Sequence, residues 1–117
     1  MMKKSPQKFF AIIGVVITLV VIALLTWFFG AGHWFWVWLA AWSVTAFIFY
    51  GYDKMQAKRG AWRIPEVVLF GLALAGGFAG ALLGMVVFRH KTNKNQFWAV
   101  NIISAVLWAT ILWFLIV

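Results

Sequence analysis

The sequence has no cysteine and very few acidic residues. Among its 117 residues there is no Cys, and Asp and Glu together number only 2. Without cysteine the chain forms no disulfide bond, no thiolate nucleophile and no cysteine-ligated metal site. Charged residues make up 10% of the chain, whereas a soluble domain carries about 25%. The composition therefore excludes an ordinary soluble globular protein.

Apolar residues fill most of the chain and are arranged in long uninterrupted runs. Hydrophobic residues make up 66% and aromatic residues 20%. We distinguish four apolar segments, at about 9–29, 34–59, 65–88 and 97–117. A helix of about 21 residues is about 31 Å long and matches the hydrocarbon core of a bilayer. We predict an all-α fold, a small polytopic transmembrane helical bundle, with residues 1–8 as a basic tail and 9–117 as one domain.

The first apolar segment also invites comparison with a secretory signal peptide, because three lysines precede it. The hydrophobic core of a signal peptide is usually about 7–15 residues long and is followed by small residues. Here the run is longer and ends in Phe28 and Phe29. We expect a retained membrane span.

Basic residues predict the orientation in the membrane. The chain has 10 Lys and Arg residues and a formal net charge of +8, and basic residues beside membrane spans are retained in the cytoplasm. We expect a multi-pass protein of the bacterial cytoplasmic (inner) membrane with a cytoplasmic N-terminus. If all four segments span, however, Arg89, Lys91 and Lys94 lie outside the cell, against this rule.

An alternative topology has three spans plus a re-entrant Gly-rich hairpin. If segment 65–88 bends back at Gly76 and Gly77, all ten basic residues become cytoplasmic. Two arguments favour four spans. The segment is long enough, at about 36 Å, to cross, and re-entrant backbone needs burial in protein that three partner helices offer poorly.

Small residues in the same segment predict close helix packing. Gly76, Gly80 and Gly84 recur every four residues and form one stripe on a continuous helix, where another backbone can approach closely. Gly77 lies beside this stripe. Asn101, an amide within the last apolar segment, should face another helix rather than lipid.

The polar residues give two candidate clusters. Asp53 and Glu66 are the only carboxylates, and they form either a structural salt bridge or a general acid or base. The second cluster is formed by Arg89, His90, Lys91 and Thr92. It suits binding of a phosphate group, because Arg offers forked hydrogen-bond donors and Lys a point charge. With four spans the clusters lie on opposite faces and cannot form one site. The candidate contacts are Tyr52, Asp53, Lys54, Arg59, Arg63, Glu66, Arg89, His90, Lys91 and Thr92.

Metal and cofactor motifs are not found. The two histidines, His33 and His90, lie in different loops and lack the spacing of a metal site. No phosphate-binding glycine motif follows a strand-like segment. We expect no metal and no cofactor.

Several blocks resemble one bacterial membrane family, catalogued as domain of unknown function 1294. They are Tyr52-Asp53-Lys54, the run GAWRIPE at 60–66, Gly76-Gly77 with Gly80, and FRHKT at 88–92. The resemblance covers about the C-terminal two thirds and implies a small helical membrane bundle, with no activity or catalytic residue to transfer. Some members carry a cold-shock domain, which binds nucleic acid. This sequence starts instead with a basic tail and an apolar segment, so we expect no nucleic-acid binding.

The first hypothesis for function is a non-enzymatic integral membrane protein. Its basic loops would contact anionic phospholipid head groups or a protein partner, and its glycines would mediate helix contact, homo-oligomer contact or contact with another membrane protein. One alternative is a membrane enzyme or carrier acting on a phosphate-bearing lipid. A second is a small transporter or channel subunit.

Overall fold

The structure, a computed structural model, describes residues 6–60, 64–88 and 95–117. Three long helices dominate it, α1 (Pro6–Phe29), α2 (Trp34–Arg59) and α5 (Asn95–Ile116), and the short helix η1 (Ala31–His33) joins the first two. No strand occurs in these ranges. The predicted all-α class is confirmed, and four helical segments are long and apolar enough to cross a membrane.

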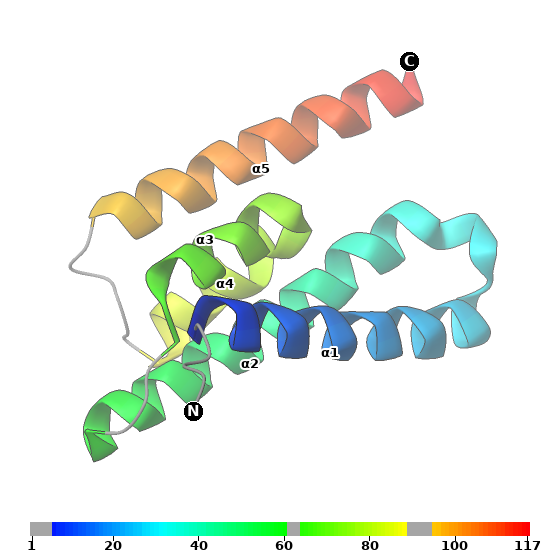
Figure 1. Cartoon of the computed structure of the whole chain (residues 1–117). Helices are drawn as coiled ribbons and strands as arrows, with labels where there is room; N and C mark the ends of the chain where they lie inside the picture. The colour runs from blue at the N-terminus through cyan, green and yellow to red at the C-terminus, as the bar shows by residue number, and fades with distance from the viewer. Residues whose placement is uncertain (1–5, 61–63, 89–94) are drawn as a thin grey trace.

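The long helices alternate in direction, so their ends gather at two ends of the molecule (Figure 1). The start of α1, the end of α2 and the start of α5 lie at one end. We call it the basic end, because α1 and α2 bring Lys8, Lys54, Lys58 and Arg59 there. The opposite end holds the α1–α2 connection, and we call it the aromatic end. Its exposed aromatic side chains are Trp27, Phe28, Phe29, Trp34 and Trp36.

Helix α2 ends as its sequence predicts. Lys58 and Arg59 lie in its last turn, where cations complement the helix dipole. Gly60 follows with φ 67 and ψ 23, and its N–H bonds the carbonyls of Ala57 and Gln56. A residue without Cβ adopts this left-handed conformation without strain, so Gly60 stops the helix.

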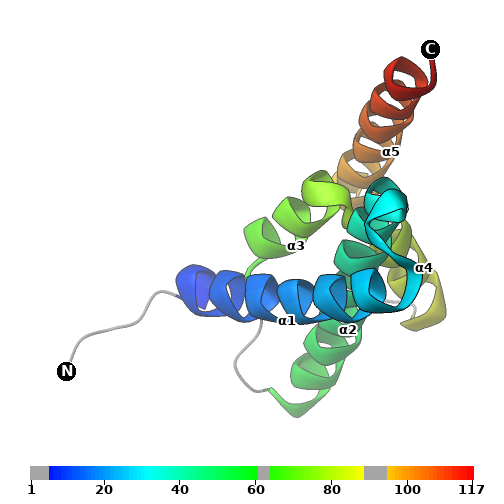
Figure 2. The ribbon, with the colours of Figure 1, turned by 90° about the vertical axis from the view of Figure 1, so that its right-hand side faces the viewer.

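The third apolar segment is a helical hairpin rather than one rod. Helix α3 (Glu66–Leu72) leads into the π-type turn η2 (Ala73–Gly77), and helix α4 (Phe78–Phe88) follows. At Gly76 the backbone has φ 134 and ψ −1, which is not helical and which glycine tolerates because it lacks a Cβ. Figure 1 shows the chain reversing direction between α3 and α4, and Figure 2 shows the two helices diverging from the turn that joins them.

Both ends of this hairpin meet α2 at the basic end. The backbone N–H of Ile64 donates to Asp53, and the carbonyl of Phe88 accepts from Lys54. The third segment therefore folds back on itself, as the re-entrant alternative supposed, although the segment as a whole is one of four that are long and apolar enough to cross a membrane. A single straight helix, which the length of the segment favoured, is not what the structure has there.

The start of α3 differs slightly from the prediction. Segment 65–88 was expected to be helical from Pro65, but Pro65 has an extended backbone, with φ −60 and ψ 144, and caps the helix. Glu66 is the first helical residue. Its carboxylate lies in the first turn, where the helix dipole is positive.

Glycines bring α4 into close contact with α2. A Cβ at Gly80 would overlap the backbone oxygen of Ser43, and one at Gly84 would lie 2.8 Å from the Cβ of Tyr50. A Cβ at Gly77 would lie 2.6 Å from the oxygen of Trp42. These glycines do not lie on one continuous helix, because Gly76 and Gly77 belong to the turn η2 and only Gly80 and Gly84 to α4. A Cβ at Gly76 would nevertheless also face α2, at 3.1 Å from the side chain of Leu39.

Burial is greatest in the hairpin. Half of its apolar window, 50%, is buried inside the protein, compared with 17% for α1 and 11% for α5. The exposed large side chains of α1 and α5 are almost all aliphatic or aromatic. The hairpin thus has the largest buried share, while α1 and α5 present mostly apolar surface outward.

Candidate functional site

Asp53 is fully buried within α2. Its exposed fraction is 0%, and its Oδ1 accepts a hydrogen bond of 3.1 Å from the backbone N–H of Ile64. Ile64 is itself buried, at 3% exposure, so this carboxyl oxygen is the acceptor that its N–H has inside the protein. Asp53 therefore holds the chain where it enters the hairpin.

Lys54 holds the other end of the hairpin. Its Nζ donates to the carbonyl of Phe88, the last residue of α4. A lysine at a helix C-terminus satisfies a free carbonyl and complements the negative end of the dipole. The neighbouring residues Asp53 and Lys54 thus act as one clamp, each on a different end of the hairpin.

Two indole groups hold the tip of the hairpin. Trp38 of α2 donates from Nε1 to the carbonyl of Ala75 at 2.7 Å, and Trp108 of α5 donates to the carbonyl of Leu74 at 3.0 Å. Both carbonyls belong to the turn η2, next to the non-helical residue Gly76. The sequence analysis did not identify either tryptophan as a partner of the hairpin, and indole spacing alone does not reveal it.

A buried polar side chain of α5 faces the neighbouring helices. Asn101 is 1% exposed and donates from Nδ2 to the Sδ of Met85 at 3.1 Å. Its side chain also interacts with Tyr50, whose ring packs on Phe97 at 6.1 Å between centroids. Asn101 therefore faces α2 and α4 rather than the outside, and it links α5 to both.

A hydroxyl pair joins the first two long helices. The Oγ1 atoms of Thr18 and Thr45 lie 2.7 Å apart, and both residues are buried. Each hydroxyl also reaches the carbonyl four residues earlier in its own helix. The sequence analysis did not predict this contact, because threonine is common in such helices and its partner depends on the packing.

The remaining sequence candidates divide into exposed and undescribed residues. Tyr52 is exposed, with its ring 6.2 Å from that of Phe10, and Arg59 is exposed at the end of α2. Glu66 is half-buried at the start of α3. Arg63, Arg89, His90, Lys91 and Thr92 lie outside the described residues.

The burial of Asp53 bears on the catalytic alternative. A general acid or base has to reach a proton on its substrate within hydrogen-bond distance. The carboxylate of Asp53 is closed off from the outside and binds a backbone N–H. Its geometry is that of a structural anchor.

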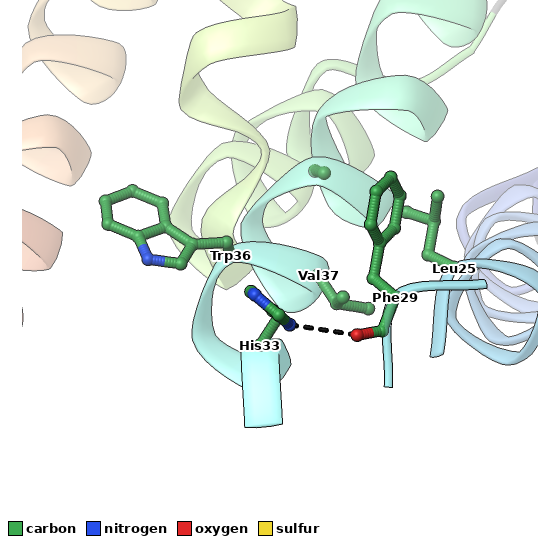
Figure 3. A pocket seen from close by; sticks show the side chains of 6 residues that line it. Leu25, Phe29, His33, Trp36 and Val37 are labelled. Carbon is green, nitrogen blue, oxygen red and sulfur yellow. Dashed lines mark hydrogen bonds between the residues drawn. The ribbon is translucent and has the colours of Figure 1, made fainter. Parts of the chain in front are cut away.

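A second feature lies at the aromatic end, where a cavity of about 290 Å³ opens between α1 and α2. Figure 3 shows His33 at its edge, between Phe29 and Trp36. The Nδ1 of His33 lies 3.0 Å from the carbonyl oxygen of Phe29. The other lining residues are Leu25, Val37 and Ala40.

Comparison with known proteins identifies the segment that carries the clamp. Residues 43–97 match the family described as protein of unknown function (DUF1294). The chain is similar to this family over that segment. The match starts within α2 and ends just inside α5, so it includes the whole hairpin together with Asp53 and Lys54. The resemblance inferred from the sequence is confirmed, over a shorter range than the C-terminal two thirds.

A relative supports the same assignment. The uncharacterized protein YsdA of Bacillus subtilis (strain 168) is 45% identical over 47 residues, which are 40% of this chain and 53% of the relative. The chain therefore spans about half the length of this curated relative. No solved structure matches the chain. The segment similar to DUF1294 thus contains the hairpin and the clamp, and the family description assigns it no function.

Proposed function

We propose that the protein is an integral protein of the bacterial cytoplasmic membrane, with three spans and one re-entrant hairpin, whose basic end binds anionic phospholipid head groups. The observation that carries this proposal is the return of Phe88 to Lys54. Because of that return, the hairpin begins and ends at the basic end.

The membrane environment is supported by the surface of the outer helices. On α1 the side chains of Ile12, Leu19 and Leu24 are each more than half exposed, and on α5 those of Ile103 and Val106 are as well. Water would solvate such surfaces poorly, whereas hydrocarbon accommodates them. These two helices would face the acyl chains.

The hairpin meets the condition for re-entrant backbone. Such backbone is tolerated at membrane depth only where protein buries it. Half of its window is buried, and indole groups from α2 and α5 satisfy its tip carbonyls. The close approach of α2 and α4 at Gly80 supports the hairpin against the objection that three helices offer too little cover.

The charge distribution supports the orientation. Among the described residues, Lys8, Lys54, Lys58 and Arg59 belong to the basic end. In the sequence, the other six basic residues precede α1 or fall in the α2–α3 and α4–α5 connections, whose flanking helix ends lie at that same end. By the positive-inside rule the basic end is cytoplasmic.

Binding of anionic lipid follows from the charge that remains available there. Lys58 and Arg59 are exposed on the last turn of α2, and a basic residue near an anionic membrane surface contributes about 1 kcal/mol. The Nζ of Lys54 already donates a hydrogen bond to the carbonyl of Phe88. The exposed pair at the end of α2 is therefore the part of the basic end that a head group reaches most directly.

Lipid retention measured by native mass spectrometry tests this proposal. The full chain in a mild detergent would be mixed with phosphatidylglycerol and phosphatidylethanolamine in equal amounts. We expect preferential retention of phosphatidylglycerol and, for the double variant Lys58→Gln with Arg59→Gln, a loss of about tenfold in its affinity at low salt.

The control is Gln96→Ala, an exposed and uncharged position at the start of α5 near the basic end, which should retain the wild-type preference. Equal retention of both lipids by the wild-type protein would contradict the proposal, as would a double variant that binds like the control.

A further inference from the structure

A groove lies between α1 and α3, in the half of the molecule nearest the basic end. Its volume is about 300 Å³, and Ala11 and Val15 of α1 line it together with Val67 and Gly71 of α3. All of its lining side chains are aliphatic or aromatic. Ligand pockets begin at about 300 Å³, so the groove has room for part of one hydrocarbon chain and is apolar enough to accept it.

Gly71 keeps the groove open. A Cβ at Gly71 would meet no atom within 4 Å, whereas one at Gly14 would lie 3.6 Å from a methyl carbon of Leu72. The helices α1 and α3 are therefore in van der Waals contact at Gly14 and Leu72, and the space over Gly71 is left free. A larger side chain at Gly71 would fill this space without displacing a neighbour.

A cation lies beside the groove on the side of the basic end. Lys8 is exposed and precedes Ala11 by three residues and Val15 by seven, a spacing that places all three on one face of α1. At the rise of a helix, Ala11 lies about 5 Å and Val15 about 11 Å deeper than Lys8. A lysine near the end of a membrane helix extends its ammonium group toward the interface. Lys8 is thus at the depth of head groups, and the groove is at the depth of the adjoining acyl chains.

The acidic residue of α3 does not oppose an anion at this position. Glu66 precedes Gly71 by five residues, so its side chain leaves α3 about 140° away from the direction of Gly71. The positive charge of Lys8 is therefore the charge of α1 and α3 that lies on the side of the groove.

We propose that the groove holds one acyl chain of a phosphatidylglycerol molecule of the cytoplasmic leaflet, with the phosphate group of that lipid on the ammonium group of Lys8. The apolar lining selects the chain, and the charge of Lys8 selects the anionic head group. The inference rests on the proposed function, which supplies the orientation in the membrane and the preference for anionic lipid. It adds a position, away from Lys58 and Arg59, where such a lipid is held by its chain as well as by its head group.

Photo-crosslinking tests the site. The full chain would be placed in nanodiscs of phosphatidylethanolamine that contain a small share of phosphatidylglycerol with a diazirine in the first part of one acyl chain. After irradiation, the labelled peptides would be mapped by mass spectrometry. We expect labelling to concentrate at residues 11–15 and 67–75. Phosphatidylethanolamine that carries the same diazirine should label these residues about fivefold less, because its head group has no net charge.

Variants separate the chain contact from the head-group contact. Gly71→Leu fills the groove and favours helix, and it should remove most of the labelling. Lys8→Gln should lower the labelling by phosphatidylglycerol about fivefold, whereas Lys8→Arg keeps the charge and should retain it. The matched control is Ala109→Leu, at an exposed position of α5 that does not line the groove, and it should label like the wild type. Circular dichroism would verify that all variants are folded.

Labelling spread evenly along α1 and α5, or unchanged in Gly71→Leu, would overturn the inference. So would equal labelling by the two lipids, or equal labelling of Lys8→Gln and wild type. The retention experiment above depends on Lys58 and Arg59 instead. A protein that retains phosphatidylglycerol preferentially there, but whose groove is not labelled, contradicts this inference alone, whereas equal retention of both lipids contradicts the proposed function.

Discussion

Asp53 and Lys54, neighbours on α2, hold opposite ends of the same hairpin. Asp53 accepts the N–H of Ile64 before α3 begins, and Lys54 donates to the carbonyl of Phe88 where α4 ends. The side chains of consecutive residues on a helix point about 100° apart. Asp53 and Lys54 can therefore contact two different parts of the backbone, at Ile64 and at Phe88. This relationship fixes both ends of the hairpin to the same part of α2.

Removing the carboxylate of Asp53 should destabilise the fold. In Asp53→Leu the N–H of Ile64 loses its acceptor inside the protein, and we expect a loss of about 1.5–3 kcal/mol in the free energy of unfolding. Asp53→Asn keeps an acceptor oxygen and should lose less. Titration of the detergent-solubilised protein with SDS measures both values. Equal stability of Asp53→Leu and wild type would show that the anchor is dispensable.

Lys54 gives a prediction localised to the end of α4. Lys54→Met keeps the apolar stem but loses the donor, so the last turn of α4 should exchange its amide hydrogens about five- to tenfold faster. Lys54→Arg retains a donor and serves as the control. Hydrogen exchange followed by mass spectrometry would detect the difference. Unchanged exchange in Lys54→Met would remove this half of the clamp.

Two glycines of the hairpin, one packed against α2 and one in open space, test whether close packing of α4 on α2 stabilises the protein. A Cβ at Gly80 would overlap the backbone of Ser43, whereas one at Gly71 meets nothing within 4 Å. Gly80→Ala should therefore cost about 1–3 kcal/mol. Gly71→Ala should be neutral or slightly stabilising, because alanine favours helix. If the two variants unfold at the same SDS concentration, close packing of α4 on α2 is not required.

The tip of the hairpin should depend on both of its indole donors. Trp38→Phe and Trp108→Phe each leave one carbonyl without its N–H donor, at about 1 kcal/mol apiece. Because the two carbonyls are separate acceptors, we expect the losses to be close to additive in the double variant. Trp34→Phe, an exposed tryptophan of the aromatic end, is the control and should unfold like wild type.

The fold class was predictable because hydropathy and charge are local properties of the sequence. Segments without charge identified the helices, and the excess of basic residues around 89–94 already favoured the folded-back topology. Helix length favoured the opposite answer. The bonds that establish the hairpin join residues far apart in the chain, such as Trp38 and Ala75, and no local pattern contains them.

The role of the candidate site was less predictable than its position. Asp53 and Lys54 were identified as polar candidates, but their partners are backbone atoms, which every residue possesses and no sequence motif marks. Gly76 was assigned to a packing stripe because of its spacing, whereas its φ of 134 places it in the turn. In each case the residue was identified and its role was set by tertiary contacts.

The most direct test of the account is the side of the membrane on which α5 begins. The chain contains no cysteine, so Gly32→Cys, Ala57→Cys and Gln96→Cys each introduce one reporter without changing any charge, and all three positions are exposed. A membrane-impermeant maleimide would be applied to intact cells and then to permeabilised cells. The hairpin predicts that Gly32→Cys reacts in intact cells, whereas Ala57→Cys and Gln96→Cys react only after permeabilisation. Reaction of Gln96→Cys in intact cells, together with Gly32→Cys, would mean that the third segment crosses the membrane and would contradict the account.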